Sequence, residues 1–364
     1  MLNLFVSFLI ITIILAILTL LPIWRFEAWW VRSLDFPRLQ LLVVSLFLLL
    51  MEAVLLDLSQ YTTWGLLIVV FFCVVYHAWW IIPYTRVFPI EVKSAKRADN
   101  QRMIRIMTAN VLTPNRNAEA LIELVRKNVP DLIVTLESDG WWQVKLDTLE
   151  SDYSYTIKCP LDNLYGMHVY SRFPLTESKV DYLVAPDIPS IHTLLTLPSG
   201  DKIRHHFLHP APPSPTENDE SSERDAELII VAKSVAETDT PVIVTGDLND
   251  VAWSETTRLF RKISGLLDPR IGRGMFNTFH ADYWFMRWPL DHLFHSDHFT
   301  LSKISRIAGF GSDHFALFTE LVLETGNNVQ QSGLKTSEDD LTWAKDKVDD
   351  QNVSKYDVPR PGTS

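Results

Sequence analysis

Three long apolar runs dominate the N-terminal part of the chain. They cover residues 2–23, 39–56 and 64–82, and Glu52 is the one charged residue within them. A helix needs about 20 apolar residues to cross roughly 30 Å of hydrocarbon, and tryptophans lie near the ends of these runs, where interfacial aromatic residues belong. The first run has no basic segment before it and two more runs follow, so the pattern predicts three transmembrane helices rather than a signal peptide.

After a polar, basic stretch at residues 84–103, the pattern changes to short apolar segments at strand and helix spacing. Many strands with helices between them, some strands adjacent in sequence, predict a mixed α/β sheet sandwich flanked by helices. We expect strands at residues 104–110, 131–136, 153–157, 167–170, 179–184, 192–197, 202–208, 241–245, 292–295 and 301–308, and helices at 117–127, 141–149 and 223–236.

Charge and cysteine content narrow the range of partners. The formal net charge of −11 argues against a protein that binds nucleic acid through a broad basic face. It does not exclude a small phosphate site bridged by a cation. The two cysteines, Cys73 and Cys159, imply no disulfide framework.

The strand at residues 241–245 is followed directly by polar side chains. Asp247 and Asn249 are separated by one residue, so strand-like spacing would place both on the same face. Further along, Asp313 and His314 add a carboxylate and a titratable imidazole at another strand end. A carboxylate and an amide at the mouth of a buried strand suit an oxygen-rich, cation-assisted phosphate site.

Similar polar residues lie at other strand ends, where neighbouring strands of a sheet would bring them together. Taken singly, each has an ordinary interpretation as a turn residue, a solvated carboxylate or a loop histidine. The ordered set, with each polar residue at its own apolar strand, favours a site for phosphoester hydrolysis. The set is Asn110, Glu137, His209, Asp247, Asn249, Asp291, Asp313 and His314.

Residues 104–322 resemble the endonuclease/exonuclease/phosphatase superfamily, the magnesium-dependent phosphoesterases that include DNase I and neutral sphingomyelinases. The resemblance implies a four-layer α/β/β/α sandwich of the DNase I type that binds Mg²⁺ and accepts Mn²⁺. The matching segments are Thr-Ala-Asn-Val at 108–111, Leu-Glu at 136–137, Tyr-Ser-Arg-Phe-Pro-Leu at 170–175, Leu-His-Pro at 208–210, Thr-Gly-Asp-Leu-Asn at 245–249, Leu-Asp-His-Leu-Phe at 290–294 and Gly-Ser-Asp-His at 311–314.

The resemblance also implies a metal-binding role for three residues. Glu137 would be the principal metal ligand, with Asn110 and Asp313 nearby. Many relatives carry Gln before this glutamate, whereas this chain has Leu136, so that side chain is not expected to be essential.

Five further positions receive catalytic roles by the same resemblance. Asp247 and Asn249 would position the nucleophilic water and the scissile phosphate. His209 would donate to a phosphate oxygen, and Asp291 would orient His314, the second catalytic histidine. The general base stays open between Asp247 and His314.

These inferences divide the chain into four parts. We expect a three-helix membrane anchor at residues 1–84, a basic juxtamembrane linker at 85–103, a catalytic domain at 104–323 and a disordered acidic tail at 324–364, which is poor in aliphatic residues. This layout resembles bacterial membrane-anchored members of the superfamily linked to teicoplanin resistance. Their implied substrates are polyprenyl or other lipid-linked phosphates, with the bilayer as a second partner.

Two other functions compete with a tethered phosphatase or phosphodiesterase. One is a tethered nuclease, which a basic groove beside the site would favour, and the other is a non-catalytic membrane scaffold that retains the fold. The arginines that could line such a groove are Arg172, Arg204, Arg258, Arg261 and Arg270.

The side of the membrane is open at this stage. The positive-inside rule places the first loop and the catalytic domain in the cytoplasm, whereas the resemblance to anchored phosphatases implies an active site that faces outward. The charges counted are Arg25, Arg32 and Arg38 in the first loop, and Arg86, Lys93, Lys96 and Arg97 after the third apolar run.

Overall fold

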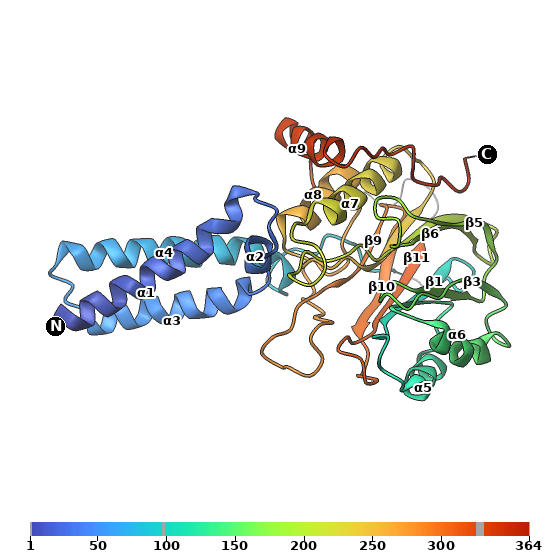
Figure 1. The fold of residues 1–364 in the computed structure, drawn as a ribbon, viewed down its shortest axis with the longest axis horizontal. Coiled ribbons are helices and arrows are strands. Elements are labelled where there is room, and N and C mark those ends of the chain that lie inside the picture. Colours follow the sequence, from blue (N-terminus) through green and yellow to red (C-terminus); the bar gives the residue numbers. More distant parts are fainter. Residues whose placement is uncertain (1, 97–98, 325–330, 364) are drawn as a thin grey trace.

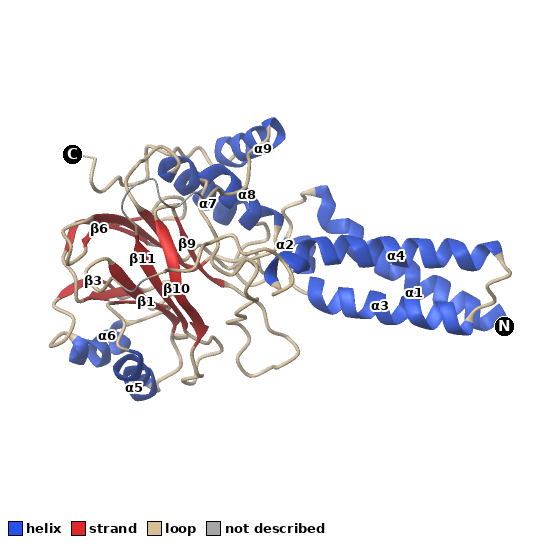
Figure 2. Ribbon diagram, turned by 180° about the vertical axis from the view of Figure 1, so that it is seen from behind, coloured by secondary structure: helices blue, strands red, loops and turns tan. Residues whose placement is uncertain are grey.

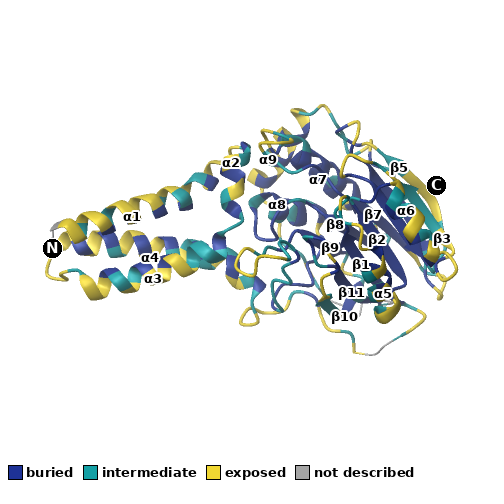
Figure 3. Ribbon diagram, turned by 60° about the horizontal axis from the view of Figure 1, so that its bottom comes forward, coloured by how far each residue is buried: buried dark blue, intermediate teal, exposed yellow. Residues whose placement is uncertain are grey.

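The computed structural model describes residues 2–96, 99–324 and 331–363. Three long helices, α1 (Leu2–Leu20), α3 (Arg38–Leu55) and α4 (Tyr61–Ile81), extend to one side of an α/β body (Figure 1). All three are long and apolar enough to cross a membrane, as predicted. Figure 3 shows that their surfaces are largely exposed, in contrast to the buried strands of the body.

The body contains two sheets that face each other (Figure 2). The first sheet has the order β10 (Phe299–Arg306), β11 (Leu317–Leu323), β1 (Met103–Asn110), β2 (Leu132–Leu136), β4 (Met167–Ser171) and β3 (Tyr155–Cys159). The second has the order β5 (Leu175–Asp181), β6 (Ser190–Thr196), β7 (Lys202–Leu208), β8 (Val242–Asp247) and β9 (Asp291–His295). Each sheet has one parallel pair in its interior, β1–β2 in the first and β7–β8 in the second.

Helices cover the outer face of each sheet. α5 (Ala118–Asn128) and α6 (Gly140–Leu146) pack on the first sheet, and α7 (Ser222–Val235) and α8 (Glu255–Ser264) pack on the second. In β1, Ile104 and Ile106 point toward the other sheet, whereas Met107 and Ala109 point toward α5 and α6. This alternation produces the predicted four-layer α/β/β/α fold.

Some predicted elements differ from the structure. β5 lies at Leu175–Asp181 rather than at residues 179–184, because it is an edge strand whose exposed residues and bulge hide its apolar pattern. α8 and β11 were not predicted at all. Single-turn helices occur at Trp29–Arg32 (α2), Leu21–Trp24, Ser33–Asp35, Ile82–Tyr84 and Asp147–Leu149.

The tail corrects another prediction. A helix, α9 (Glu338–Asp349), packs on α7 and α8, so disorder is the wrong description for this segment. Ser337 and Asp340 form a capping box at its start. Ala344 and Val348, one helical turn apart, join the core of the second sheet. The acidic composition of the tail concealed these two local signals.

The loop between α1 and α3 lies against the body. The backbone N–H of Trp29 donates to Asp219 O (2.8 Å), and the Trp253 indole donates to Asp35 O (2.9 Å). The loop and the body therefore lie at the same end of the three long helices. Arg97, one of the charges counted above, lies outside the described residues.

Candidate active site

Strand pairing brings the predicted residues to one edge of the two sheets. In the first sheet, β1 and β2 run parallel with Asn110 opposite Leu136, which places Glu137 beside Asn110. β11 runs antiparallel to β1, so Asp313 and His314, just before β11, reach the same edge. The hydroxyl of Ser312 donates to Asn110 O (2.8 Å) and fixes this loop to the end of β1.

The second sheet contributes the remaining residues in the same way. Asp247 pairs with Asp291 in the antiparallel β8–β9 ladder. Leu208 pairs with Gly246 in the parallel β7–β8 ladder, which places His209 near Asp247. A Cβ at Gly246 would lie 1.8 Å from Leu208 O, so only glycine permits this close approach.

Contacts between the sheets join the two halves of the site. The hydroxyls of Thr108 and Thr245 are 2.9 Å apart across the interface between the sheets. Two residues further along each strand, on the same face, Asn110 meets Asp247. Asn110 Nδ2 donates to Asp247 Oδ2 (3.1 Å) and to Glu137 Oε1 (2.7 Å), so this amide bridges two carboxylates.

Two site residues have left-handed backbones, which are uncommon for residues other than glycine. A regular continuation of β2 would turn Glu137 toward the α5–α6 face, but its φ of 57° redirects the side chain toward Asn110. Asn249 has φ of 51°. Such conformations persist where the surroundings enforce them, and they cluster at functional sites.

Asn249 corrects the expectation from strand spacing. β8 ends at Asp247, and Asn249 lies in a tight turn in which its backbone N–H donates to Asp247 Oδ1 (2.9 Å). Its side-chain amide donates to Pro210 O (3.0 Å). Asn249 therefore links the turn after β8 to the loop after β7, rather than sharing a strand face with Asp247.

His314 is buried between two carboxylates. Its Nδ1 lies 2.8 Å from Asp291 Oδ2, and its Nε2 lies 3.5 Å from Asp247 Oδ2. Burial lowers the pKa of His314, but Asp291 and Asp247 outweigh burial and raise the pKa to about 10. His314 is therefore protonated at neutral pH. Burial raises the pKa of Asp247, yet His314 and His209 bring it below its ordinary value.

His209 has the opposite character. It is 2% exposed, its Nδ1 has no hydrogen-bond partner among the described residues, and its ring lies 5.2 Å from the Tyr165 ring. Burial lowers the pKa of His209 to about 4, although Asp247 acts to raise it. This histidine is neutral at pH 7 and can present either an N–H or a lone pair. Tyr165 was not predicted, because an isolated tyrosine in a loop carries no sequence signal.

Glu137 fits a metal-binding role. Burial raises the pKa of Glu137 to about 7, and its Oε2 is buried without a hydrogen-bond partner among the described residues. Asp313 lies close enough to raise this pKa further, while Asn110 and His314 act to lower it. A buried carboxylate oxygen without a partner is stabilised by a cation, and hard divalent cations prefer such oxygen ligands.

Among the described residues, Asp247, Asp291 and His314 form a group whose possible metal-ligand atoms all lie within 4.8 Å of one another. His314 does not suit a metal, because a protonated imidazole has no free lone pair. Its two carboxylates are already its counter-charges. Asn110 and Glu137 lie directly beside this group, and the metal-binding role of Asn110, Glu137 and Asp313 stays a prediction.

A buried ion-pair chain supports the turn after β8. Arg224 Nη1 donates to Asn249 O (2.8 Å), and the same guanidinium pairs with Asp225 (2.9 Å) and Asp250 (3.5 Å). Lys347 of α9 extends the chain to Asp225 (2.5 Å). The sequence did not reveal these residues, since charged positions on a helix usually indicate a solvated face.

The fold and these contacts define a phosphoester hydrolase with a carboxylate-rich centre. The Endonuclease/Exonuclease/phosphatase family model matches residues 107–314, more than half of the chain, and the protein belongs to this family. No curated protein sequence matches the chain.

Solved structures of the same fold include three informative neighbours. TDP2 from D. rerio, humanized by 14 mutations, has a TM-score of 0.52 at 17% identity and covers 60% of this chain and 99% of its own. An endonuclease/exonuclease/phosphatase from Beutenbergia cavernae has a TM-score of 0.52 at 19% identity, and the match covers 66% of this chain and 76% of the neighbour. The human Nocturnin catalytic domain, with bound sulfate, has a TM-score of 0.51 at 18% identity, and the match covers 62% of this chain and 96% of the neighbour. At these identities the likeness concerns the fold alone.

Proposed function

We propose that this protein is a membrane-tethered phosphoester hydrolase that uses Mg²⁺, or Mn²⁺ in its place, and acts on a lipid-linked or membrane-proximal phosphate. One observation carries the proposal: the segment at residues 279–287 contacts both the catalytic centre and the start of α3. The catalytic centre and the anchor are thus connected through one short stretch of chain.

The contacts of this segment are specific. The Phe279 ring lies 4.9 Å from the His314 ring, and the backbone N–H of Ala281 donates to Asp313 O (2.6 Å). At the other end, Gln40 Nε2 donates to Phe285 O (2.9 Å), and Gln40 belongs to the first turn of α3.

The tip of the segment exposes four large apolar side chains, Tyr283, Trp284, Phe285 and Met286, and Trp284 is 79% exposed. A contiguous apolar patch of this kind indicates an interaction surface. Because it lies beside the anchor, and aromatic residues prefer the membrane–water interface, the bilayer is the partner that it suits. A phosphoester presented at that surface would lie close to His314.

The charges of the site suggest how the chain's own residues act. Glu137, Asn110 and Asp313 would hold a divalent cation, which neutralises phosphate oxygens and stabilises the leaving group when bound. His314, protonated and held by Asp291, would donate to the developing negative charge.

The protonation of His314 also bears on which residue, Asp247 or His314, is the general base. His314 has no lone pair with which to accept a proton, so we assign the orientation and deprotonation of the attacking water to Asp247. His209, neutral and buried beside Asp247, would donate an N–H to a phosphate oxygen. Asn249 would hold the loops after β7 and β8 in register.

A nuclease is the second candidate, since D. rerio TDP2 has been solved with a single-strand DNA product. Four of the five arginines expected to line a basic groove do not favour it here, and the fifth, Arg258, lines a cavity that contains none of the eight predicted site residues. Arg204 and Arg270 are buried, with Arg270 paired to Asp268, and Arg261 pairs with Glu91. Arg172 stacks on Tyr153.

A substrate panel tests the proposal. Full-length protein in detergent would be assayed with bis-p-nitrophenyl phosphate, p-nitrophenyl phosphate, plasmid DNA and a polyprenyl pyrophosphate, each with Mg²⁺ or with EDTA. We expect Mg²⁺-dependent hydrolysis, fastest for the lipid phosphate. Preferred cleavage of plasmid DNA would instead favour the nuclease, and no hydrolysis of any substrate would favour a scaffold.

The division into a membrane anchor, a juxtamembrane linker and a catalytic domain is a proposal too, as is the side of the membrane. The first loop contacts the body, so both would lie on one side of the bilayer, as three spans require. Alkaline phosphatase fused after Arg102 would be inactive, and green fluorescent protein bright, if the domain is cytoplasmic. The reverse pattern would indicate an outward-facing site and strengthen the case for an envelope lipid substrate.

A further inference from the structure

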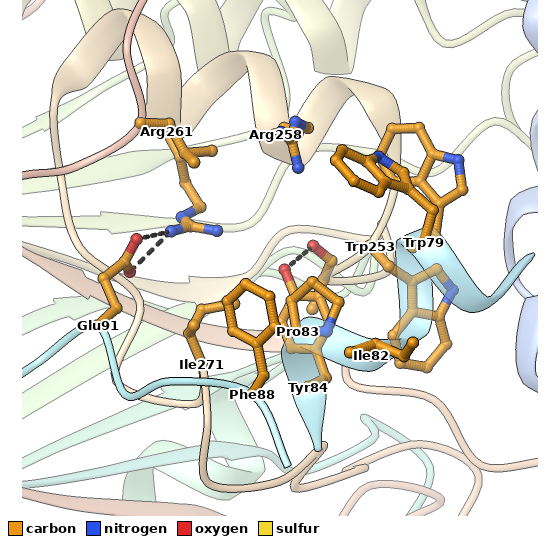
Figure 4. A pocket seen from close by; sticks show the side chains of 13 residues that line it. Trp79, Ile82, Pro83, Tyr84, Phe88, Glu91, Trp253, Arg258, Arg261 and Ile271 are labelled. Carbon is orange, nitrogen blue, oxygen red and sulfur yellow. Dashed lines mark hydrogen bonds and ion pairs between the residues drawn. The ribbon is translucent and has the colours of Figure 1, made fainter. Parts of the chain in front are cut away.

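A cavity of about 400 Å³ lies at the junction between the anchor and the body, between the last turn of α4 and α8 (Figure 4). Trp79, Ile82 and Phe88 line it from the anchor side, and Trp253 and Ile271 line it from the body. Its volume is within the range of about 300–1,000 Å³ that is usual for small-ligand sites. Its walls are mostly aromatic and aliphatic.

Arg258 of α8 is the exceptional side chain in this cavity. Among the described residues it makes no ion pair and no side-chain hydrogen bond, and its guanidinium carbon lies 5.7 Å from the centre of the Trp80 ring. Its neighbour Arg261 differs, since it forms two contacts with Glu91 at 2.5 and 2.7 Å. Figure 4 shows the Arg258 side chain apart from that pair.

A half-buried guanidinium without a direct ion pair among the described residues can take a bound anion as its partner. Burial, followed by repulsion from Arg261, lowers the pKa of Arg258, although Tyr84, Asp340 and Glu91 act to raise it. Arginine nevertheless stays protonated in proteins, so it cannot lose its charge as a buried carboxyl group can. A bound anion would remove the cost of the unpaired charge.

The position of the cavity identifies the source of that anion. The third apolar span ends at Tyr84, beside the cavity, and Trp79 is 66% exposed on the last turn of α4. If the three helices cross a bilayer, as proposed above, this level is the membrane–water interface, where lipid phosphates lie. A free phosphate ion would make no use of the apolar walls, whereas an acyl chain would.

We propose that the cavity binds one anionic phospholipid of the surrounding bilayer, with its phosphate on Arg258 and part of an acyl chain against Trp79 and Ile82. The site is separate from the catalytic centre, because none of the eight predicted catalytic-centre residues lines the cavity. Bound there, the lipid would fix α8 and the following loops against the anchor.

Native mass spectrometry of the full-length protein in detergent tests this proposal. The protein would be titrated separately with phosphatidylglycerol, phosphatidylcholine and glycerol 3-phosphate. Wild-type protein should bind one phosphatidylglycerol about five- to tenfold more tightly than phosphatidylcholine, and glycerol 3-phosphate should not compete at the same concentration.

Three variants make the test specific. Arg258→Gln should abolish the preference for phosphatidylglycerol, and Arg258→Lys should retain most of it, because a point charge still pairs with phosphate. Arg126→Gln, an exposed position on α5 away from the anchor, is the control and should bind as wild type. If Arg258→Gln does not fold, the wild-type preference between the two lipids and the competition with glycerol 3-phosphate still decide the question.

Three results would overturn the proposal. The first is equal binding of the two lipids by wild-type protein. The second is a preference that survives in Arg258→Gln. The third is competition by glycerol 3-phosphate, which would assign the cavity to a soluble phosphate. Each is independent of hydrolysis, so a failure here is distinguishable from a failure of the proposed enzymatic function.

Discussion

The catalytic centre and the junction cavity both use the segment after β8, and they differ in how charge is balanced. In the catalytic centre, His314 lies between Asp247 and Asp291, and its positive charge is matched on both sides. In the junction cavity, Arg258 has no direct ion pair with a described residue, because nearby Glu91 pairs with Arg261 and nearby Asp340 pairs with Lys262.

This difference in pairing separates the charges that the fold itself balances from those that a bound ligand could balance. A centre for anionic substrates needs its cations fixed in advance, and paired carboxylates hold His314 in place at little cost in reorganisation. An unpaired arginine has no such internal partner. We infer that the protein completes its catalytic centre from its own residues and a metal ion, and completes its junction with a lipid.

Removal of the central imidazole should have the largest effect on catalysis. His314→Ala should lower kcat for bis-p-nitrophenyl phosphate by about 10²–10³-fold, the usual loss for one transition-state donor. Asp291→Asn should lose less, because the imidazole remains while its orientation and charge balance weaken. The surface variant His298→Ala serves as control. Parent-like kcat in Asp291→Asn would show that the Asp–His pairing has no functional role.

The buried ion-pair chain behind the turn should matter for stability. Lys347 is 4% exposed and pairs with Asp225 and Glu27. Lys347→Met should lower the free energy of unfolding by about 2 kcal/mol, less than the usual 3–5 for a broken buried pair because Arg224 still pairs with Asp225. Thermal unfolding in detergent would measure it, with exposed Lys345→Met as control. An equal, small shift of the unfolding midpoint in both variants would show that these buried ion pairs do not contribute to stability.

A buried carboxyl group differs from Arg258 in that it can become neutral by holding a proton. Glu227 of α7 has Oε1 without a partner among the described residues, and burial raises its pKa to about 8 from an ordinary value of 4.5. Because the folded form holds the proton that the unfolded form releases, stability should fall as pH rises from about 4.5 to about 8.

Glu227→Gln removes this dependence. It should raise the midpoint of thermal unfolding at pH 8 by the equivalent of about 1–3 kcal/mol, and by much less at pH 5. Exposed Glu123→Gln is the control. The same shift at both pH values would mean that Glu227 is not a buried, protonated group.

The apolar segment beside the anchor should affect only the presentation of substrate. Trp284→Ser should lower the ratio of the rate on a vesicle-borne lipid phosphate to the rate on bis-p-nitrophenyl phosphate by about fivefold or more, since an interfacial aromatic side chain is removed. Trp141→Ser on α6 is the control. An unchanged ratio would leave the segment without a role at the membrane.

The sequence was most informative where an apolar strand ends in a polar residue. The structure places all eight predicted residues at one edge of the two sheets, because parallel pairing aligns the ends of β1 with β2 and of β7 with β8. Their individual roles remain predictions. The sequence analysis assumed that the strand continues through Asn249. The structure instead has a left-handed turn at this residue.

Features that depend on contacts between segments far apart in the sequence could not be predicted from the pattern of apolar and polar residues. The junction cavity is lined by residues of both α4 and α8. The burial of Lys347 depends on contacts of α9 with α7 and the first loop. In the sequence, Arg258 and Lys347 resemble ordinary solvated charges on helices. Their surroundings, rather than their spacing, give them significance.

The central claim is that Glu137 holds the catalytic metal, and parallel titrations of Mn²⁺ binding and hydrolysis test it most directly. Mn²⁺ bound to EDTA-treated, full-length protein would be followed by electron paramagnetic resonance, with bis-p-nitrophenyl phosphate hydrolysis measured in the same samples. Wild type and the exposed control Glu123→Gln should gain activity in proportion to bound Mn²⁺. Glu137→Gln should lose tight binding and nearly all activity, with partial recovery in excess metal. Hydrolysis that persists in EDTA, or a Glu137→Gln variant that binds Mn²⁺ and turns over like wild type, would contradict the account.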